Sequence, residues 1–309
     1  METINIAMAA DERYAQHAVV AMVSILRHAL HPGDIQFYLL ADQLSAQMEE
    51  RVHSSIQANG AVIEILPLPE ERVTGLYTSG QLSRTTYARL QMEELLPADV
   101  HRVIYLDCDM VAYDDIEKLW QADLASHPVG AVKDFGIMAS RKSWRQKCTV
   151  LGMRDGQPYF NAGLLLLDLD RWREKKVGKT VLDLVQHRAF PHHDQDALNF
   201  VFQDDWQVLP MCWNVIPPVY DMFLKVLWRS AYRKEAVEAM KHVAILHYAG
   251  GYKPWEYSLH AGFNDEYYRC LEKTSFADVP MPQFDARRKH RSLRRQLLRM
   301  AWGRFWAGA

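Results

Sequence analysis

Residues 103–109 read Val103-Ile104-Tyr105-Leu106-Asp107-Cys108-Asp109, and this stretch decides the fold of the chain. Its four apolar or aromatic residues, without polar alternation, are typical of a strand covered on both faces, as in a parallel sheet. Residues two apart in a strand point to the same side, so Asp107 and Asp109 can converge on one small object. Close carboxylates repel each other, and a divalent cation that prefers hard oxygen ligands relieves the repulsion. We therefore predict a site for Mg²⁺ or Mn²⁺, with Cys108 pointing away from it; the alternative is that both acids are solvated or cap the next helix.

The composition is that of a globular protein with an ample core. The chain has 309 residues, of which 49% are hydrophobic and 24% are charged, enough for about two domains or for one large α/β domain. Its four cysteines are far apart and form no Cys-x-x-Cys pair, which indicates free thiols in a reducing compartment. We see no pattern of a secretory signal, and no stretch has the roughly 18 apolar residues of a transmembrane helix. We therefore expect a cytoplasmic location.

The charges are divided unevenly between the body of the chain and its C-terminus. The net charge is −2, but eight arginines and lysines lie between residues 287 and 304, and no acidic residue follows Asp285. The rest of the chain has 28 basic against 38 acidic residues, a net charge of −10 that argues against a nucleic-acid groove. Apolar residues at near-helical spacing lie among these arginines, so we expect residues 287–306 to form an amphipathic helix on an anionic membrane surface. The alternatives are a helix packed on the domain or a disordered terminus.

Strand and helix patterns alternate in the first part of the chain. Apolar runs predict strands, and apolar residues on one helical face predict helices between them. The predicted strands are residues 3–10, 35–40 and 62–66, and the predicted helices are residues 14–29 and 45–59. This β-α-β-α-β order is how nucleotide-binding α/β domains begin, with a ligand crevice at the strand ends.

Several polar residues in the middle of the chain are candidates for ligand binding. Arg89, in a helix predicted at residues 83–96, is either a donor to phosphate, sugar or the Asp pair, or a surface arginine. Asp134 stands at the end of a strand predicted at residues 129–133. Asn161 and Gly163 interrupt an apolar run, which indicates the close approach of a ligand or of backbone.

One further acidic pair competes for the metal role, and another stands at the start of a predicted helix. Asp168-Leu169-Asp170 leads directly into a helix, so we interpret Asp170 as its N-cap. Asp194 and Asp196, in the run His192-His193-Asp194-Gln195-Asp196, precede a helix predicted at residues 197–202, where the helix dipole favours acids. The two histidines have no further ligand at zinc spacing, so a zinc site is a poor interpretation.

A last strand, predicted at residues 243–246, ends in His247-Tyr248-Ala249-Gly250-Gly251-Tyr252-Lys253. A neutral imidazole at a strand end can bind a metal. The Gly250-Gly251 pair lets backbone amides approach an anion, and Lys253 adds a positive charge. Together with Asp107 and Asp109, these residues would surround a metal pyrophosphate.

Six sequence blocks in this order resemble glycosyltransferase family 8, particularly the bacterial enzymes that add galactose or glucose to lipopolysaccharide or lipo-oligosaccharide. The resemblance covers about residues 3–256. The blocks are Ala9-Ala10-Asp11, Thr85-Thr86-Tyr87-Ala88-Arg89-Leu90, Tyr105-Leu106-Asp107-Cys108-Asp109, Phe160-Asn161-Ala162-Gly163, Asp194-Gln195-Asp196 and His247-Tyr248-x-Gly250-x-x-Lys253-Pro254-Trp255.

The resemblance implies an α/β fold of the GT-A type with a Rossmann-like nucleotide-binding sheet, which we expect in residues 1–265, followed by an extension in residues 266–309. It also implies UDP-galactose or UDP-glucose as donor, Mn²⁺ (or Mg²⁺) as cofactor and retention of the anomeric configuration. The implied acceptor is a saccharide, which we expect to be lipid-linked and reached from the inner face of the cytoplasmic membrane. The implied metal ligands are Asp107, Asp109 and His247, with Asp107 also at the donor. Ala9 and Asp11 would contact uridine, Gly250 and Lys253 would hold the diphosphate, and the sugar pocket would contain Arg89, Asp134, Asn161, Asp194 and Gln195.

The residues fit this chemistry. The metal and Lys253 can neutralise the charge that develops on UDP, and Gln195 or the carboxylates of Asp194 and Asp196 can stabilise the oxocarbenium ion. Because Gln195 is a poor nucleophile, we favour front-face attack over two displacements.

Other functions fit less of the sequence. The stretch Asp107-Cys108-Asp109-Met110-Val111 also matches a haloacid-dehalogenase-type phosphatase, but its motif usually ends the first strand. A nucleotidyltransferase would need a glycine-rich loop near the N-terminus. A non-catalytic, membrane-docking carbohydrate-binding protein is the remaining alternative.

Overall fold

The computed structural model describes residues 2–69, 84–220, 230–251, 253–256 and 264–280. It begins with β1 (Ile4–Asp11), α1 (Ala15–His28), β2 (Ile35–Asp42), α2 (Ala46–Ala58) and β3 (Val62–Pro67). The apolar runs form the strands, and α2 starts at an N-cap, Ser45, whose hydroxyl accepts a hydrogen bond from Met48 N at 3.2 Å. The predicted β-α-β-α-β order is therefore confirmed.

The described strands form a seven-stranded sheet in the order β3-β2-β1-β4-β7-β6-β8. Its later members are β4 (Arg102–Leu106), β6 (Val129–Lys133), β7 (Phe160–Asp168) and β8 (Gln207–Leu209). The central strand β4 is buried, as predicted, but it is parallel to β1 and antiparallel to β7. The sheet is therefore mostly parallel, and the carboxyl ends of β1 and β4 meet at the edge where β7 begins.

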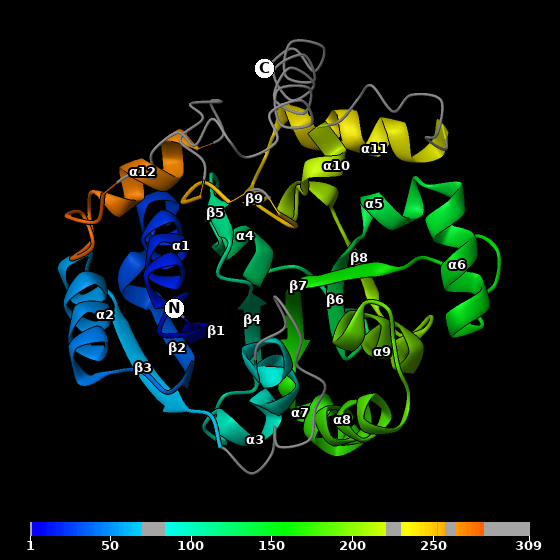
Figure 1. The fold of residues 1–309 in the computed structure, drawn as a ribbon, viewed down its shortest axis with the longest axis horizontal. Helices are drawn as coiled ribbons and strands as arrows, with labels where there is room; N and C mark the ends of the chain where they lie inside the picture. The colour runs from blue at the N-terminus through cyan, green and yellow to red at the C-terminus, as the bar shows by residue number, and fades with distance from the viewer. Residues whose placement is uncertain (1, 70–83, 221–229, 252, 257–263, 281–309) are drawn as a thin grey trace.

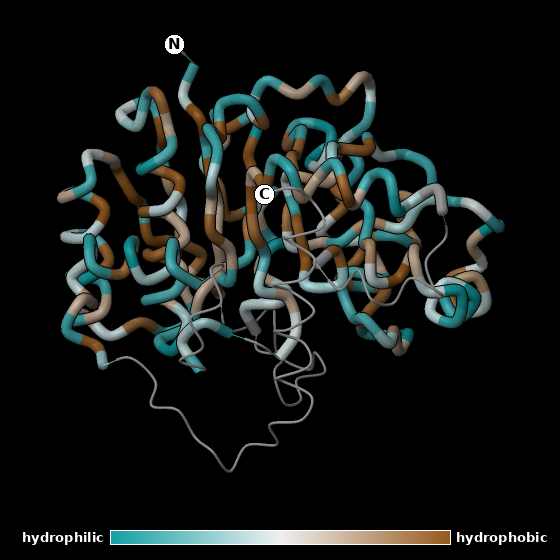
Figure 2. The backbone as a smooth tube through the Cα atoms, turned by 90° about the horizontal axis from the view of Figure 1, so that it is seen from above, coloured by the Kyte–Doolittle hydropathy of each residue, from teal (hydrophilic) through white to brown (hydrophobic). Residues whose placement is uncertain are grey.

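Helices cover both faces of the sheet (Figure 1). Successive residues of a strand point to opposite faces, and along β1 Ile6 and Met8 enter one buried cluster while Ala7 and Ala9 enter the other. The first cluster includes residues of α1 and of the late helix α12 (Asp265–Leu271). The second includes residues of α7 (Leu169–Lys175), α8 (Val177–His187) and α9 (His193–Phe202). Figure 2 shows the hydrophobic positions gathered along the central strands, with hydrophilic positions outside.

A small antiparallel sheet lies beside the carboxyl end of β4. Its strands are β5 (Met110–Ala112), which directly follows Asp109, and β9 (Ile245–His247). Met110 pairs with His247. The predicted last strand thus exists, but it begins two residues later than expected and includes His247. This pairing brings the end of β9 next to the acids that follow β4.

The helix predicted at residues 83–96 is found in the described part of that range, as a 3₁₀ helix, η3 (Arg84–Gln91), followed by the short α3 (Met92–Leu95). A predicted helix cap is wrong. The N-cap of α7 is Asp168, not Asp170, and its Oδ1 accepts a hydrogen bond from Arg171 N at 3.0 Å. Asp168 takes this role because it ends β7 in the extended conformation that a capping residue adopts.

The C-terminal part of the chain is described only up to residue 280. α12 packs on α1, where Glu266 Oε1 lies 3.0 Å from Arg27 Nε. The predicted basic helix at residues 287–306 lies outside the described residues. Within the described ranges, no helix combines the length and apolar character needed to cross a bilayer. The remaining elements are η1 (Pro32–Asp34), α4 (Glu117–Trp120), α5 (Phe135–Met138), α6 (Arg141–Leu151), η4 (Met211–Trp213), α10 (Pro217–Tyr220) and α11 (Ser230–Lys241).

Candidate active site

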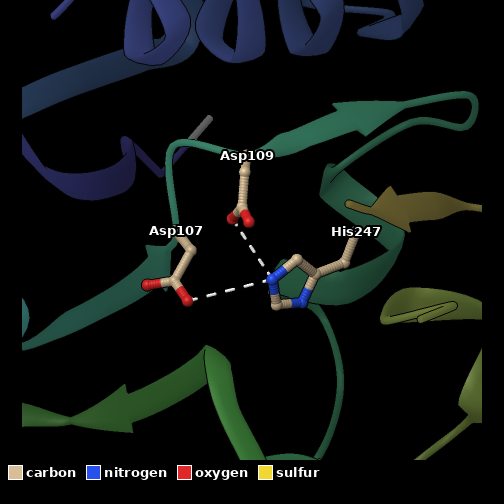
Figure 3. A group of neighbouring side chains, drawn as sticks. All are labelled: Asp107, Asp109 and His247. Carbon is tan, nitrogen blue, oxygen red and sulfur yellow. Dashed lines mark ion pairs between the residues drawn. The ribbon is translucent and has the colours of Figure 1, made fainter. Parts of the chain in front are cut away.

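The structure brings Asp107, Asp109 and His247 together at the carboxyl end of β4 (Figure 3). His247 Nε2 lies 3.2 Å from Asp109 Oδ1 and 4.0 Å from Asp107 Oδ2. One ligand atom from each of the three residues lies within 4.8 Å of the others. Cys108, between the two acids, is turned away, with its Sγ 2.9 Å from the carbonyl oxygen of Ala9. Cys108 thus points away from the two acids, as predicted, although β4 ends at Leu106 and the chain bends at Cys108 and Asp109.

Gly163, in β7, has no side chain, and the cluster occupies the space that a side chain would fill. Its carbonyl oxygen accepts a hydrogen bond from Asp107 N at 2.8 Å, which ties β7 to the first acid. A Cβ on Gly163 would lie 2.6 Å from His247 Cε1 and 2.8 Å from Asp107 Oδ2. The close approach predicted for this glycine is therefore found, and the approaching groups are two of the three predicted metal ligands.

The donor set fits a divalent cation. Two carboxylates and one imidazole suit Mn²⁺ or Mg²⁺ better than a thiophilic metal, and Lys253 and Arg89 contribute further positive charge. Lys253 Nζ contacts Asp109 Oδ2, and Arg89 NH2 lies 3.0 Å from Asp107 Oδ1. Burial alone would raise the pKa of Asp109, but its contacts with His247 and Lys253 lower it well below its usual range. The surroundings of Asp109 thus favour its ionised form.

A cavity of about 190 Å³ opens beside the cluster. Gly250, one of its lining residues, has a φ of +85°, a conformation that glycine adopts without strain. Five residues predicted to bind the donor are not part of the lining: Asp11, Asp134, Asn161, Asp194 and Gln195. Asp11 Oδ1 accepts hydrogen bonds from the backbone nitrogens of Arg13 and Tyr14 at 3.0 and 2.9 Å. The lining residues are Ala9, Tyr14, Thr85, Thr86, Arg89, Tyr105, Asp107, Cys108, Asp109, Gly250 and Lys253.

Arg89 joins this cavity to the acids of α9. Its side chain is buried between Asp107 and Asp194, with Nε 3.0 Å from Asp194 Oδ2. Burial would lower the pKa of Arg89, but Asp107, Tyr105 and Asp194 raise it well above its usual value. Burial raises the pKa of Asp194, although the charge of Arg89 opposes the shift. The buried carboxylate of Asp194 is thus ion-paired with an arginine that lines the cavity.

Gln195 is held by hydrogen bonds on both sides of its amide. Its Nε2 donates to Asp134 Oδ2 at 3.1 Å and to the hydroxyl of Tyr159 at 3.0 Å, and its Oε1 accepts from Ala162 N at 3.0 Å. Asp134 Oδ2 also accepts from Asn161 Nδ2 at 3.2 Å. Three residues expected around the sugar, Asp134, Asn161 and Gln195, thus lie in one network with Asp107 and Arg89 nearby.

Asp196 lies behind this network. Its side chain is fully buried, and its Oδ1 is 2.5 Å from Lys147 Nζ and 2.7 Å from the Tyr159 hydroxyl. Its Oδ2 accepts from His192 N at 2.9 Å. Because Tyr159 also accepts from Gln195, the carboxylate of Asp196 acts on Gln195 through Tyr159 in this arrangement. Lys147, in α6, did not stand out in the sequence.

Two other supporting residues were also missed. Asn214, which follows η4, has its Oδ1 2.9 Å from His247 Nδ1. His17, in α1, stacks on Trp255 with ring centroids 3.6 Å apart, and its Nδ1 is 2.7 Å from the hydroxyl of Tyr267. Trp255 follows Lys253 by two positions, so this stack supports the basic loop. An asparagine in a loop and a histidine on an apolar helix face carry no pattern that separates them from ordinary core residues.

A mostly parallel sheet flanked by helices, with two acids, an imidazole and a lysine around a crevice at its strand ends, defines a GT-A type glycosyltransferase. The chain belongs to glycosyl transferase family 8, whose family model matches residues 5–258. This match confirms the family resemblance of the six sequence blocks and leaves the phosphatase and nucleotidyltransferase alternatives without support.

Relatives of known name agree with this assignment. The chain is 28% identical to general stress protein A of Bacillus subtilis over 91% of its own length and 97% of that protein. It is 27% identical to lipopolysaccharide 1,2-glucosyltransferase of Escherichia coli, over 82% of its own length and 73% of that enzyme. Among solved structures, the galactosyltransferase LgtC in complex with donor and acceptor sugar analogs superimposes with a TM-score of 0.77 at 29% identity, covering 90% of this chain and 98% of that one.

Proposed function

We propose that this chain is a retaining, metal-dependent hexosyltransferase that moves galactose or glucose from a UDP-sugar to a saccharide of lipopolysaccharide, lipo-oligosaccharide or a related glycan. One observation carries the proposal: Asp107, Asp109 and His247 converge beside a cavity that Lys253 and Arg89 also line or border. The names of two relatives, a lipopolysaccharide glucosyltransferase and a galactosyltransferase, support this choice of sugars and acceptor.

In this proposal the residues at the strand ends neutralise the negative charge that develops on the leaving diphosphate. Asp107, Asp109 and His247 would hold Mn²⁺ (or Mg²⁺), which supplies Lewis-acid stabilisation of a departing diphosphate. Lys253, which contacts Asp109, places its ammonium where it can pair with a phosphate oxygen. The amide of Gly250 can approach the same anion because no Cβ intervenes. Ala9 and Asp11, at the end of β1, would lie at the uridine.

The α9 side of the crevice would bind the sugar. Asp194 would accept a hydrogen bond from a sugar hydroxyl, and Arg89 pairs with the carboxylates of both Asp194 and Asp107. The amide of Gln195 is fixed by Ala162, Asp134 and Tyr159, and a carboxamide does not form a stable glycosyl ester. Asp134 and Asn161 complete this wall.

The reaction we favour is therefore attack from the face that UDP leaves. The acceptor oxygen bonds to the anomeric carbon as the bond to the phosphate oxygen breaks, and a phosphate oxygen takes the hydroxyl proton. Asp196 is enclosed by Lys147, Tyr159 and His192, so it supports Gln195 instead of attacking the sugar. A glycosyl group trapped covalently on Asp196 would contradict this route.

A panel of donors tests the proposed function. Purified protein is incubated with UDP-galactose, UDP-glucose, UDP-N-acetylglucosamine and GDP-mannose, with Mn²⁺ or with EDTA, and nucleotide release is measured with and without a set of saccharide acceptors. We expect Mn²⁺-dependent UDP release from one UDP-hexose. Release of inorganic phosphate from a phosphomonoester, with no turnover of any UDP-sugar, would replace the proposal with the phosphatase alternative. Binding of sugars without any turnover would replace it with a carbohydrate-binding protein.

We further propose that residues 287–306 hold the enzyme on the anionic inner face of the cytoplasmic membrane, close to a lipid-linked acceptor. The support is the sequence alone, which places eight basic residues between residues 287 and 304. Sedimentation with vesicles that contain anionic lipid should fall when residues 287–309 are removed. Unchanged sedimentation would rule this out.

A further inference from the structure

Asn214 holds the imidazole of His247 from the side opposite the acids. The segment that carries Asn214 lies against β9, where Val215 bridges to Leu246 and His247 N donates to Val215 O at 3.1 Å. The side chain of Asn214 is 2% exposed, and its Oδ1 is 2.9 Å from His247 Nδ1. The other ring nitrogen, Nε2, faces Asp107 and Asp109 (Figure 3). The two nitrogens of His247 therefore have different partners.

The direction of the hydrogen bonds in this region is fixed by groups that have only one role. The backbone nitrogen of Gly163 can only donate, and it lies 3.0 Å from Asn161 Oδ1, so the Asn161 atom at that position is the oxygen. Asn161 Nδ2 correspondingly faces the carboxylate of Asp134. Asn161 Oδ1 then accepts from Asn214 Nδ2 at 2.9 Å, which leaves Asn214 Oδ1 toward His247. A carbonyl oxygen can only accept, so His247 Nδ1 must donate.

We propose that Asn214 is a positioning residue that keeps the ring proton of His247 on Nδ1 and presents an unprotonated Nε2 to the divalent cation. The inference rests on the proposed metal-dependent function. A metal-binding histidine needs one free nitrogen, and the partner of the other nitrogen selects it. The competing acceptor for the ring proton is Asp109 Oδ1, 3.2 Å from Nε2. Without Asn214, the ring proton can move to Nε2, and the Nε2–H group can donate a hydrogen bond to Asp109 Oδ1. Neither His247 nor Asp109 is then free to bind the cation.

Three variants separate this role from a structural one. Asn214→Leu removes the acceptor, whereas Asn214→Asp keeps an oxygen facing Nδ1. Asn199→Leu is the matched control: Asn199 is 1% exposed and bonds both the nitrogen and the oxygen of Phe160, at 2.9 and 3.0 Å, without contacting His247. Nitrogen-15 NMR of histidine-labelled, metal-free protein at pH 8 reports which nitrogen of His247 carries the proton. Calorimetry with Mn²⁺, in the presence of UDP, reports the affinity.

In wild type we expect the proton on Nδ1. Asn214→Leu should lose this preference and raise the Kd for Mn²⁺ by about 10- to 100-fold, while Asn214→Asp and Asn199→Leu should keep both the tautomer and the affinity within a few-fold of wild type. A wild-type His247 protonated on Nε2, or a folded Asn214→Leu protein that binds Mn²⁺ as tightly as wild type, would overturn the inference. If Asn214→Leu does not fold, the tautomer of His247 in wild type and in Asn214→Asp, measured by NMR, decides whether Asn214 has the proposed role. A wild type that binds no Mn²⁺ would defeat the proposed function, and the NMR result would still decide the role of Asn214.

Discussion

Two of the three Asp-x-Asp motifs of this chain, Asp107-x-Asp109 and Asp168-x-Asp170, stand at opposite ends of the same pair of strands. Asp107 and Asp109 follow β4, whereas Asp168 ends β7 and Asp170 lies just beyond it. Because the strands are antiparallel, Asp168 lies opposite Arg102, at the start of β4. Five residues of strand separate Arg102 from Asp107, which places the two motifs roughly 17 Å apart. Strand direction alone thus sends one motif to the ligand edge of the sheet and the other to the far edge.

Their partners differ accordingly. The first pair meets residues from distant parts of the chain: His247 and Lys253 at Asp109, and Arg89 at Asp107. The second pair meets mainly its own helix: Asp168 caps α7 and pairs with Arg171, and Asp170 lies 3.6 Å from Arg173. Its one distant ion-pair partner among the described residues is the exposed His101, 3.0 Å from Asp170. The same three-residue pattern is therefore a ligand cluster where other elements converge on it, and a helix start where they do not.

The strongest way to break this comparison is to remove one acid from each motif. Asp109→Asn should lower kcat/KM for the UDP-sugar by about 10³-fold, or about 4 kcal/mol of transition-state stabilisation, because the site loses a ligand for the ion that stabilises the leaving diphosphate. Asp170→Asn should leave kcat/KM within twofold of wild type. Steady-state kinetics over a range of Mn²⁺ concentrations measures both. An Asp109→Asn enzyme that retains more than a tenth of wild-type activity would remove the distinction.

The sequence was sufficient for the part of the site that depends on strand ends. An apolar run followed by Asp107 and Asp109, a later strand ending at His247 and an Asn161-x-Gly163 interruption each carry a local signal, and the structure brings these residues together. The β-α-β-α-β beginning was also predictable, because alternating apolar periodicities specify it.

What the sequence did not reveal depends on packing between distant segments. Lys147 is one lysine in a polar stretch of α6, and nothing local shows that it is buried against Asp196. Asn214 becomes informative only once its segment lies beside β9. The choice of Asp168 over Asp170 as a cap depended on the last residue of β7, and strand ends are hard to place from sequence to within two residues.

Lowering the pH tests the comparison further, because the buried imidazole of His17 lies close to the ligand edge. Burial lowers the pKa of His17 to about 3, although Asp109 opposes the shift. The unfolded chain therefore takes up a proton near pH 6.5 that the folded chain refuses, so the stability contributed by neutral His17 is complete above pH 6.5 and falls as the pH drops toward 3. Between pH 7.5 and pH 5, wild type should lose about 2 kcal/mol more unfolding free energy than His17→Asn, measured by urea denaturation.

His17→Asn is the matched variant because its amide stays neutral over this range and can still reach the hydroxyl of Tyr267. The measured quantity is the difference between the two proteins in how their unfolding free energy changes with pH. Contributions from carboxyl groups elsewhere in the chain are the same in both proteins and cancel. Equal slopes in the two proteins would show that His17 is protonated in the folded state, and the stack on Trp255 would then not be a buried neutral pair.

The smallest expected effect is at the far edge, and it tests whether the second motif is purely structural. Asp168→Ala removes the acceptor for Arg171 N, and the loss of an N-cap costs about 1 kcal/mol of unfolding free energy. The exposed pair with Arg171 adds little, because water screens it. Ser45→Ala, which removes the N-cap of α2, is the control and should cost a similar amount. Both proteins should keep wild-type kcat/KM and Mn²⁺ dependence at temperatures where they are folded, since Asp168 lies at the far edge and Ser45 is not among the residues that line the cavity. If Asp168→Ala altered the Mn²⁺ dependence while Ser45→Ala did not, the second motif would belong to the metal chemistry, and strand direction would not be what separates the two.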